Sequence, residues 1–250
     1  MIACTTPFPR VAILRNYPLD VETEWGQQML DSIAGLVRQS QPEAAIEYYA
    51  PIDGGDTPDA ASFNLVILTG GTWDITLPEE QFDPWVARTV NWIRQTVRES
   101  PSTKLVGICW GHQVIARALG GTVVYGKAGT LIGVREIQLN HTGSKVFKGF
   151  NFLRLHKFHK RVVERAPPGF TDLANDHEIM RSDSDRILTF QGHPEMTAKI
   201  GRGIVGHGDP SYLPDPSPAG IEKLHRDLEK AEDGKQVWPV VMSWAFPATT

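Results

Sequence analysis

The first half of the chain alternates short apolar runs with longer amphipathic stretches. Apolar runs predict strands over residues 10–14, 46–49, 63–68 and 104–108. The third run is almost wholly apolar, which is typical of a central strand covered on both faces. Apolar residues at helical spacing predict amphipathic helices over residues 22–39, 84–99 and 110–119. This alternation of strand and helix predicts an α/β fold.

The second half is richer in short β-like segments. These segments cover residues 131–134, 152–155, 170–174 and 187–190. Proline and acidic residues predict a loop over 207–218, and a charged helix with a solvated face is expected over 219–231. No repeat or change of composition divides the chain. We therefore expect a single domain over 1–250, with a motif-bearing core at about 10–206 followed by the Pro-rich loop and C-terminal helix of 207–250.

Composition narrows the possible partners. The chain has 250 residues and a formal net charge of -4, and no basic run is interleaved with aromatic residues. A nucleic-acid partner is therefore not expected. No apolar stretch is long enough to cross a bilayer, and Met1 to Pro7 do not resemble a secretory signal. We expect a cytoplasmic protein with no membrane partner.

Cysteine and histidine patterns indicate neither disulfides nor a metal site. With only 2 cysteines there is no disulfide framework, and Cys4 is interpreted as an inert thiol. The 8 histidines do not occur at ligand spacing, and His156 and His159 are interpreted as one core or site residue and one solvated neighbour. The chain has no Gly-x-x-x-x-Gly-Lys phosphate loop and no Gly-x-Gly-x-x-Gly turn. No cofactor and no metal are expected.

Cys109 lies between a predicted strand and a predicted helix, in the segment Gly107-Ile108-Cys109-Trp110-Gly111-His112-Gln113. Flanking glycines allow the sharp turn and close helix packing of a nucleophile elbow, with sulfur in place of oxygen. The N-terminus of the following helix favours a thiolate over a thiol. A lone intracellular cysteine is more often a buried apolar residue. The glycines and the downstream histidine favour the nucleophile here.

The segment Gln191-Gly192-His193-Pro194-Glu195 supplies a candidate base and a group to orient it. His193 follows an apolar strand, and strand ends are where α/β folds build their sites. Glu195 is two residues further on, a spacing that lets its carboxylate reach the imidazole and fix the tautomer. Alone, the same residues would be read as a surface turn. With Cys109 they predict a Cys-His-Glu catalytic triad.

Donors for an oxyanion are predicted at two places. Gly70 and Gly71 follow the central strand and can turn their N–H groups toward a cavity, and the Trp110 amide lies beside the nucleophile. The alternative for the glycine pair is a plain turn that ends a strand.

The Gly-x-Cys-x-Gly-x-Gln segment, the upstream Gly-Gly turn and the His-Pro-Glu tripeptide together resemble class I glutamine amidotransferases, in order and spacing over about residues 11–197. The resemblance implies a flavodoxin-like, doubly wound, mixed but mostly parallel sheet with helices on both faces. It also implies a γ-glutamyl thioester on Cys109, acid and base catalysis by His193, and orientation by Glu195. Gly71 and Trp110 match the oxyanion donors. Gln113 matches a glutamine-holding position, and His159 matches the histidine of the family's Ser-His-Gly-Asp segment.

Three departures bear on the substrate. Thr72 stands where the family usually has proline, and Gly192 where an aromatic residue usually precedes the histidine. Arg161 replaces the acidic residue of Ser-His-Gly-Asp, beside Lys157 and Lys160. This basic group predicts either a carboxylate-binding patch or solvated lysines on a strand edge.

Three functions remain open at this point. The first is a stand-alone hydrolase that cleaves a γ-glutamyl or related amide of a small-molecule substrate through a Cys thioester, as γ-glutamyl peptidases of this superfamily do. The second is a glutaminase subunit that supplies ammonia to a separate synthase chain. The third is a non-catalytic binding protein on the same fold, which the intact Cys109, His193 and Glu195 disfavour.

Overall fold

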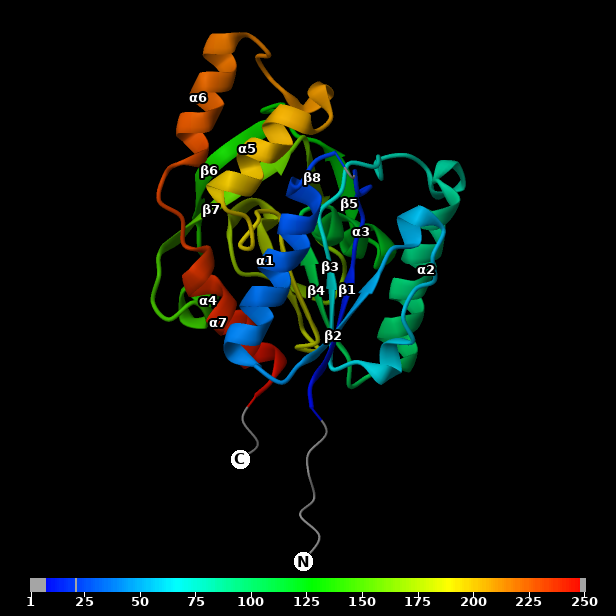
Figure 1. Cartoon of the computed structure of the whole chain (residues 1–250). Helices are drawn as coiled ribbons and strands as arrows, with labels where there is room; N and C mark the ends of the chain where they lie inside the picture. The colour runs from blue at the N-terminus through cyan, green and yellow to red at the C-terminus, as the bar shows by residue number, and fades with distance from the viewer. Residues whose placement is uncertain (1–7, 21, 248–250) are drawn as a thin grey trace, which may run out of the picture.

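A computed structural model describes residues 8–20 and 22–247, so Cys4 lies outside the described residues. Within those residues the main sheet has seven strands (Figure 1). In spatial order they are β2 (Ala45–Tyr49), β1 (Arg10–Leu14), β3 (Leu65–Leu68), β4 (Lys104–Ile108), β11 (Ile187–Phe190), β10 (Ile179–Ser182) and β9 (Phe170–Asp172). The first five strands are parallel, and β10 and β9 complete the sheet in antiparallel fashion.

Two antiparallel strand pairs lie outside this sheet. They are β5 (Thr122–Tyr125) with β8 (Arg161–Arg165), and β6 (Leu131–Gln138) with β7 (Phe152–His159). In Figure 1 both pairs lie toward the top, the end at which the parallel strands finish. The sequence predicted parts of β6 and β7 but did not predict that they leave the main sheet.

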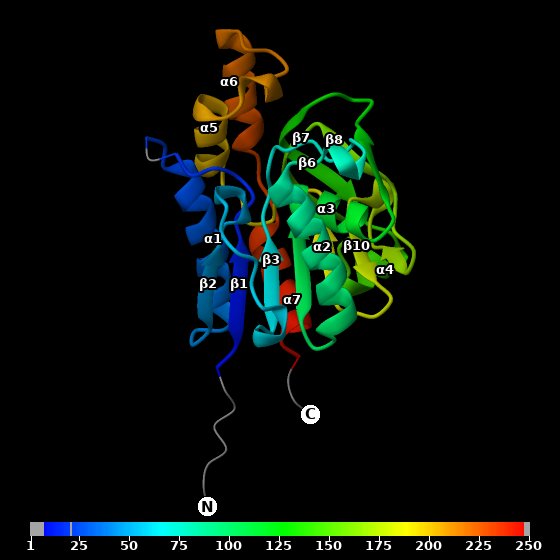
Figure 2. The ribbon, with the colours of Figure 1, turned by 90° about the vertical axis from the view of Figure 1, so that its right-hand side faces the viewer.

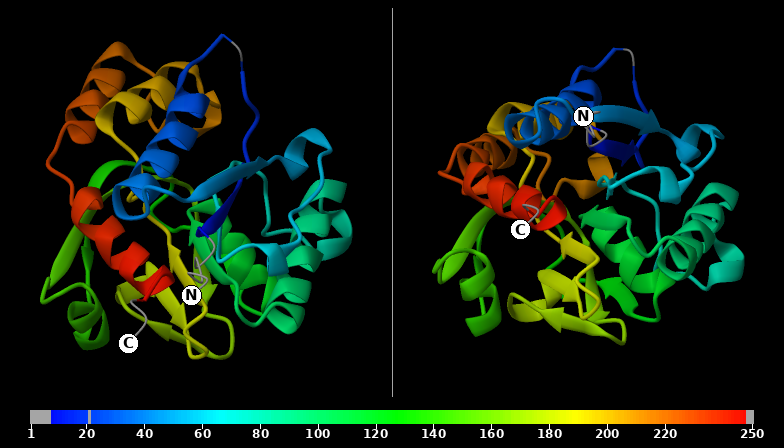
Figure 3. Two further views of the ribbon diagram at one scale, coloured as in Figure 1. Left: turned by 60° about the horizontal axis from the view of Figure 1, so that its bottom comes forward. Right: turned by 90° about the horizontal axis from the view of Figure 1, so that it is seen from below.

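Helices cover both faces of the sheet, as Figures 2 and 3 show. One face packs against α1 (Trp25–Ser40), α5 (Ala198–His207) and α7 (Gly234–Ala245), and the other against α2 (Pro84–Glu99) and α3 (Trp110–Ala118). Alternate residues of one strand serve opposite faces: Val11 and Ile13 contact the first layer, while Ala12 and Leu14 contact the second. The predicted mixed, mostly parallel sheet with helices on both faces is confirmed.

The strands formed where continuous apolar sequence predicted them. β3 and β11 are buried at every position, as expected for parallel strands covered on both faces. The helix bounds agree closely as well: α2 begins at Pro84, whose fixed φ suits the first helical position, and it ends at Glu99 as predicted.

Three helices were missed by the sequence analysis: α4 (His141–Val146), α5 and α7. α5 contains three glycines, which give a weak helical signal. Two of them face neighbouring helices: a Cβ on Gly201 would lie 2.6 Å from Leu228, and one on Gly203 would lie 2.7 Å from Trp25. Close helix packing therefore stabilises a helix that intrinsic propensity disfavours. α7 contains Pro239, which also obscured its pattern.

The expectation of a simple loop and one C-terminal helix over 207–250 was wrong in detail. Residues Pro210–Tyr212 form a short 3-10 helix, η5, and the loop is followed by both α6 (Pro218–Leu228) and α7. Ser217 caps α6 by accepting a hydrogen bond from the Gly220 N–H at 3.1 Å. None of the helices in the described part of the chain is long and apolar enough to cross a membrane.

We propose that the C-terminal helix belongs to the same folding unit as the sheet, and Trp238 tests this. Its side chain is 1% exposed in the core, and its indole N–H has no hydrogen-bond partner among the described residues. Trp238→Ala should lower the free energy of unfolding of the whole chain by about 3–5 kcal/mol. Trp238→Phe should cost less than about half of that, because it keeps most of the ring and removes the unpartnered donor.

Urea unfolding followed by circular dichroism measures both effects. The exposed Gln236→Ala change on the same helix is the matched control and should stay within about 0.5 kcal/mol of the parent. An unchanged main transition in Trp238→Ala would show that α7 is not part of the unit.

Candidate active site

The predicted site residues meet at the carboxyl edge of the parallel strands. Gly70 and Gly71 follow β3, Cys109 follows β4, and His193 lies three residues after β11. The chain passes outward from β1 to β2 and returns across β1 to β3, so the strand order reverses between β1 and β3. Such reversal points are where open α/β sheets form ligand crevices.

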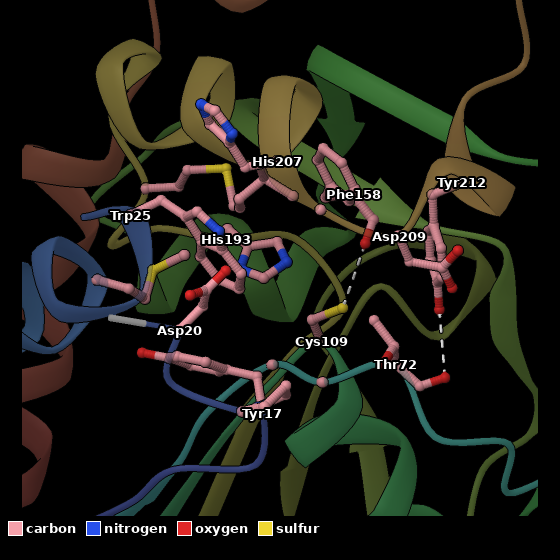
Figure 4. A pocket seen from close by; sticks show the side chains of 17 residues that line it. Tyr17, Asp20, Trp25, Thr72, Cys109, Phe158, His193, His207, Asp209 and Tyr212 are labelled. Carbon is pink, nitrogen blue, oxygen red and sulfur yellow. Dashed lines mark hydrogen bonds between the residues drawn. The ribbon is translucent and has the colours of Figure 1, made fainter. Parts of the chain in front are cut away.

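Cys109 occupies a sharp turn between β4 and α3. Its φ of 53° and ψ of −102° lie in a region that non-glycine residues rarely adopt. The turn is held by a hydrogen bond of 2.7 Å from the Cys109 N–H to the Phe190 carbonyl. α3 approaches so closely that a Cβ on Gly111 would lie 2.3 Å from the Leu68 carbonyl oxygen. The strained turn directs the sulfur into a cavity, where it lies 3.7 Å from the Phe158 carbonyl oxygen (Figure 4).

His193 and Glu195 form a buried pair. The His193 Nδ1 and the Glu195 Oε1 are 2.8 Å apart, and the two residues are 4% and 2% exposed. Burial alone would lower the pKa of His193, but the charges of Glu195 and Cys109 outweigh it and raise the pKa to about 10. The imidazole is therefore protonated at neutral pH. Its other nitrogen, Nε2, has no hydrogen-bond partner within the described residues.

The imidazole of His193 and the thiol of Cys109 face one another in Figure 4. A Cβ built on Gly70 would lie 2.9 Å from the His193 Cε1 and 3.7 Å from the Cys109 Cβ, so both side chains border the same glycine. The structure thus brings together the thiol, the imidazole and the carboxylate that the sequence singled out.

The glycine turn after β3 is sterically required. A Cβ on Gly71 would lie only 2.4 Å from the Asn16 carbonyl oxygen. Aromatic packing anchors the loop that follows: the Trp110 indole donates to the Trp73 carbonyl at 3.0 Å, and the rings of Trp73 and Trp85 pack edge to face at 5.4 Å. Because Trp110 opens α3, its N–H has no acceptor within the helix. Both candidate oxyanion donors, the N–H groups of Gly71 and Trp110, therefore lie next to Cys109 on backbone that is held in place by packing.

The interpretation of His156 and His159 needs correction, because both are buried, at 1% and 3% exposure. They lie on opposite faces of β7, and the structure covers both faces. The backbone carbonyl of His156 accepts a hydrogen bond from the backbone N–H of His193 at 2.9 Å. Burial lowers the pKa of the His156 side chain to about 4. Two imidazoles in neighbouring positions thus shift in opposite directions, because His193 has a carboxylate partner and His156 has none.

Of the two alternatives for the basic residues, solvated lysines are wrong for Lys157, whereas Lys160 in the β7–β8 turn is partly exposed. Lys157 is 2% exposed and forms an ion pair with Glu178. The Lys160 ammonium contacts the Ser211 hydroxyl at 3.2 Å and lies 4.3 Å from the centre of the Tyr212 ring.

Arg161 is buried and serves as a hub. Its guanidinium donates to the Thr72 carbonyl and to the Tyr212 hydroxyl, the latter at 2.7 Å, and it lies 3.6 Å from an Asp74 carboxylate oxygen. Its own carbonyl accepts from the Gln113 amide at 2.7 Å and lies 3.0 Å from the His159 Nδ1. These contacts connect the glycine loop, α3, the β7–β8 turn and η5.

Close packing favours glycine at position 192, where an aromatic residue usually precedes the histidine in the family described above. A Cβ at this position would lie 3.1 Å from the Leu155 Cβ, because β7 crosses directly beside it. A side chain at this position would require Leu155 to shift slightly.

Two hollows adjoin Cys109. A large cavity of about 240 Å³ has His193 in its wall. Its other walls include Tyr17, Asp20, Trp25, Met29, Met196, Ile204, His207 and Asp209. A narrow cleft, already filled by its own side chains, is lined by Gln113, His159, Lys160 and Arg161. Gly71, Cys109, Phe158 and Tyr212 border both hollows.

Phe158 and Tyr212 were not identified from the sequence. Their rings stack at a centroid distance of 6.0 Å beside the sulfur. Tyr212 lies in the Pro-rich loop, where no periodic pattern marks a buried residue, although it is only 3% exposed. In the residues described, no group of three or more His, Cys, Asp or Glu side chains is arranged to hold a metal ion.

Comparison with known proteins gives the family. A model of the glutamine amidotransferase class-I family matches residues 27–203. The glutamine amidotransferase-like protein chry6 of Gibberella zeae is 37% identical, and the match covers 98% of each chain. The chain belongs to the class I glutamine amidotransferase family.

More distant relatives differ in their named activities. Gamma-glutamyl peptidase 4 of Arabidopsis thaliana is 28% identical over 68% of this chain and 70% of its own length. Anthranilate synthase component 2 of Buchnera aphidicola is 33% identical over 42% of this chain and 54% of its own. A solved glutamine amidotransferase from Thermotoga maritima shares the fold with a TM-score of 0.69 at 21% identity, covering 95% of this chain and 96% of that one.

The position of Cys109 beside the His193 imidazole and at the N-terminus of α3 predicts unusual reactivity of its sulfur. In a Cys4→Ser background, iodoacetamide should alkylate Cys109 at pH 6 at least ~10-fold faster than it alkylates a free cysteine, which is mostly protonated at that pH. His193→Ala should remove the advantage, because the imidazolium no longer stabilises the thiolate. Mass spectrometry of the labelled peptide gives the rate. Equal rates for the parent and His193→Ala would contradict an ion pair.

Proposed function

We propose that this protein is a stand-alone hydrolase that cleaves a γ-glutamyl or related amide bond through a thioester on Cys109. The observation that carries the proposal is the buried Glu195–His193 pair beside the Cys109 turn, with a cavity of about 240 Å³ on the His193 side. Family membership and the similarity to a γ-glutamyl peptidase support an amide substrate.

In the first half of the reaction, the Cys109 thiolate attacks the amide carbonyl carbon. The carbonyl oxygen becomes an oxyanion, for which the Gly71 and Trp110 N–H groups, with Gly70 completing the turn, are the proposed donors. His193 then donates its Nε2 proton to the amide nitrogen, the C–N bond breaks, and the free amine departs. A thioester remains on the sulfur, and His193 is neutral.

In the second half, neutral His193 takes a proton from a water molecule as that water attacks the thioester carbonyl. The second oxyanion collapses, the C–S bond breaks, and the thiolate and imidazolium return with release of the carboxylic acid. Glu195 orients the imidazole and stabilises its positive charge at each stage. Keeping Cys109 reduced suits a cytoplasmic location, which we also propose.

The two hollows are the proposed places for the two parts of the substrate. The leaving amine must lie within reach of His193, and His193 lines the large cavity but not the narrow cleft. The acyl chain then occupies the cleft beside Gln113, His159 and Arg161. Both N–H groups of the Gln113 amide are directed at protein acceptors, the Arg161 carbonyl and Gln191 Oε1. Lys160 and Arg161 provide positive charge for a carboxylate on the acyl chain.

The narrow cleft has to open before an acyl chain enters, because its own side chains fill it. Tyr212 and Lys160 come from the outer loop and the β7–β8 turn, so a shift of their side chains opens it without moving the sheet.

A glutaminase subunit that supplies ammonia to a separate synthase is the second candidate, favoured by the similarity to anthranilate synthase component 2. The large cavity favours the hydrolase, because ammonia as leaving group needs no hollow of this size. Purified protein alone, given glutamine, glutathione and γ-glutamyl dipeptides, should release glutamate from the dipeptides. Release only after addition of a synthase would establish the subunit function instead.

Variants of the three central residues should separate catalysis from orientation. Cys109→Ala and His193→Ala should each lower kcat by at least ~10³-fold, because they remove the nucleophile and the proton donor. Glu195→Ala should cost on the order of 10²-fold, since the imidazole remains. Glutamate release under saturating substrate measures kcat, and circular dichroism checks folding. Full activity in a folded Cys109→Ala variant would eliminate the thioester route.

The pH profile tests the role of His193. Its raised pKa of about 10 means that the imidazole stays protonated below that pH and can donate to the leaving amine. We expect kcat/KM to fall as pH rises through about 10, and Glu195→Gln to move this alkaline limb down by ~1–3 pH units because an opposite charge is lost. Glu43→Gln, an exposed change before β2, is the control and should leave the limb in place.

A further inference from the structure

The large cavity next to Cys109 has a wall chemistry that differs from that of the narrow cleft. Its side walls are formed largely by aromatic and apolar side chains from four parts of the chain: Tyr17 after β1, Trp25 and Met29 of α1, Phe158 of β7, and Met196 and Ile204 at α5. Tyr17 and Trp25 pack with ring centroids 5.2 Å apart. Such a lining binds a ligand mainly by burying apolar surface.

The size of the cavity allows more than a small amine. A cavity of about 150 Å³ lined by apolar residues is sufficient for a benzene ring. The volume here is about 240 Å³, which admits an aromatic ring on a short chain.

Apart from its histidines, the charged side chains among the described residues of the cavity wall are acidic. Asp20 and Asp209 lie in its wall, while none of the described residues that line it is a lysine or an arginine. Asp209 is ionised at neutral pH: burial raises its pKa, but hydrogen bonds from Ser211 and the charges of Lys160 and Arg161 outweigh this and keep it below the usual value. The imidazoles of His193 and His207 also line the cavity.

The lysine and the arginine of this region line the other hollow. Lys160 and Arg161 line the narrow cleft and not the large cavity. The two cations therefore line the hollow proposed for the acyl chain, and the carboxylates of Asp20 and Asp209 line the hollow proposed for the leaving amine. A carboxylate on the amine would lie near Asp20 and Asp209, where like charges repel.

We propose that the preferred substrate is an amide of a bulky apolar or aromatic amine that carries no carboxylate, and that Asp20 and Asp209 disfavour amino acids and peptides as leaving groups. This inference rests on the proposed function, because it takes the large cavity as the place of the departing amine. The leaving amine is neutral or positively charged beyond its reacting nitrogen.

A matched pair of substrates tests the proposal. γ-Glutamyl-phenethylamide and γ-glutamyl-phenylalanine differ by one carboxylate on the amine. We expect kcat/KM for the phenethylamide to exceed that for the phenylalanine compound by ~10-fold or more, which corresponds to about 1.4 kcal/mol of discrimination. γ-Glutamyl-methylamide provides the size control and should also react more slowly than the phenethylamide, because it leaves the apolar walls uncovered.

The variant Asp20→Asn/Asp209→Asn should reduce the preference to within ~3-fold, chiefly by raising kcat/KM for γ-glutamyl-phenylalanine. Asp215→Asn is the matched control, since it removes the same charge from the same loop as Asp209 but lies outside the cavity wall. It should leave the preference as in the parent.

A binding measurement keeps the inference testable without turnover. Phenethylamine should slow alkylation of Cys109 by iodoacetamide, whereas phenylalanine at the same concentration should not. Cleavage of both γ-glutamyl compounds at equal rates, or equal protection by both amines, would overturn the inference and leave the proposed hydrolase standing. Selective protection by phenethylamine without cleavage of any γ-glutamyl compound would instead support the cavity and refute the proposed acyl group.

Discussion

The site depends on the pairing of buried charges at the carboxyl edge of the sheet. An imidazolium removed from water is unfavourable unless an opposite charge is close, and His193 has Glu195 on one side and Cys109 on the other. His193 and Glu195 follow β11, whereas Cys109 follows β4. Bringing the sulfur to the imidazole therefore requires β4 and β11 to be neighbours in parallel register. The sheet order is therefore the condition for the chemistry, and the helices that cover the sheet exclude the water that would weaken it.

Sequence patterns were sufficient for the parts of the fold whose stability is local. Strands such as β3 and β11 are continuous apolar runs, and α2 is amphipathic and begins at a proline. α5 and α7 could not be predicted because their sequences contain glycines and a proline, and they are stabilised by packing against other helices. The departure of β6 and β7 from the main sheet is likewise a tertiary property that no local pattern encodes.

The same distinction applies to the site: residues that belong to a sequence motif could be predicted, whereas residues that only line the cavity or the cleft could not. Cys109, His193 and Glu195 stood out because spacing and flanking glycines marked them, and the structure places them together. Phe158, Tyr212 and the buried state of Arg161 were missed, because each reaches the sulfur through contacts between distant segments. Motifs identified the reacting groups, whereas the shape and charge of the surrounding walls required coordinates.

In the proposed hydrolase, the position of Arg161 also links selection of the acyl chain to the rate of the reaction. One guanidinium holds both the hydroxyl of Tyr212, which borders the entrance, and the carbonyl of Thr72, the neighbour of Gly71. A displacement of the outer loop is consequently transmitted to the peptide beside the oxyanion position. Under the proposed function, a change in the length or sequence of that loop therefore alters substrate choice and turnover together, which constrains how far the outer surface of the protein can diverge.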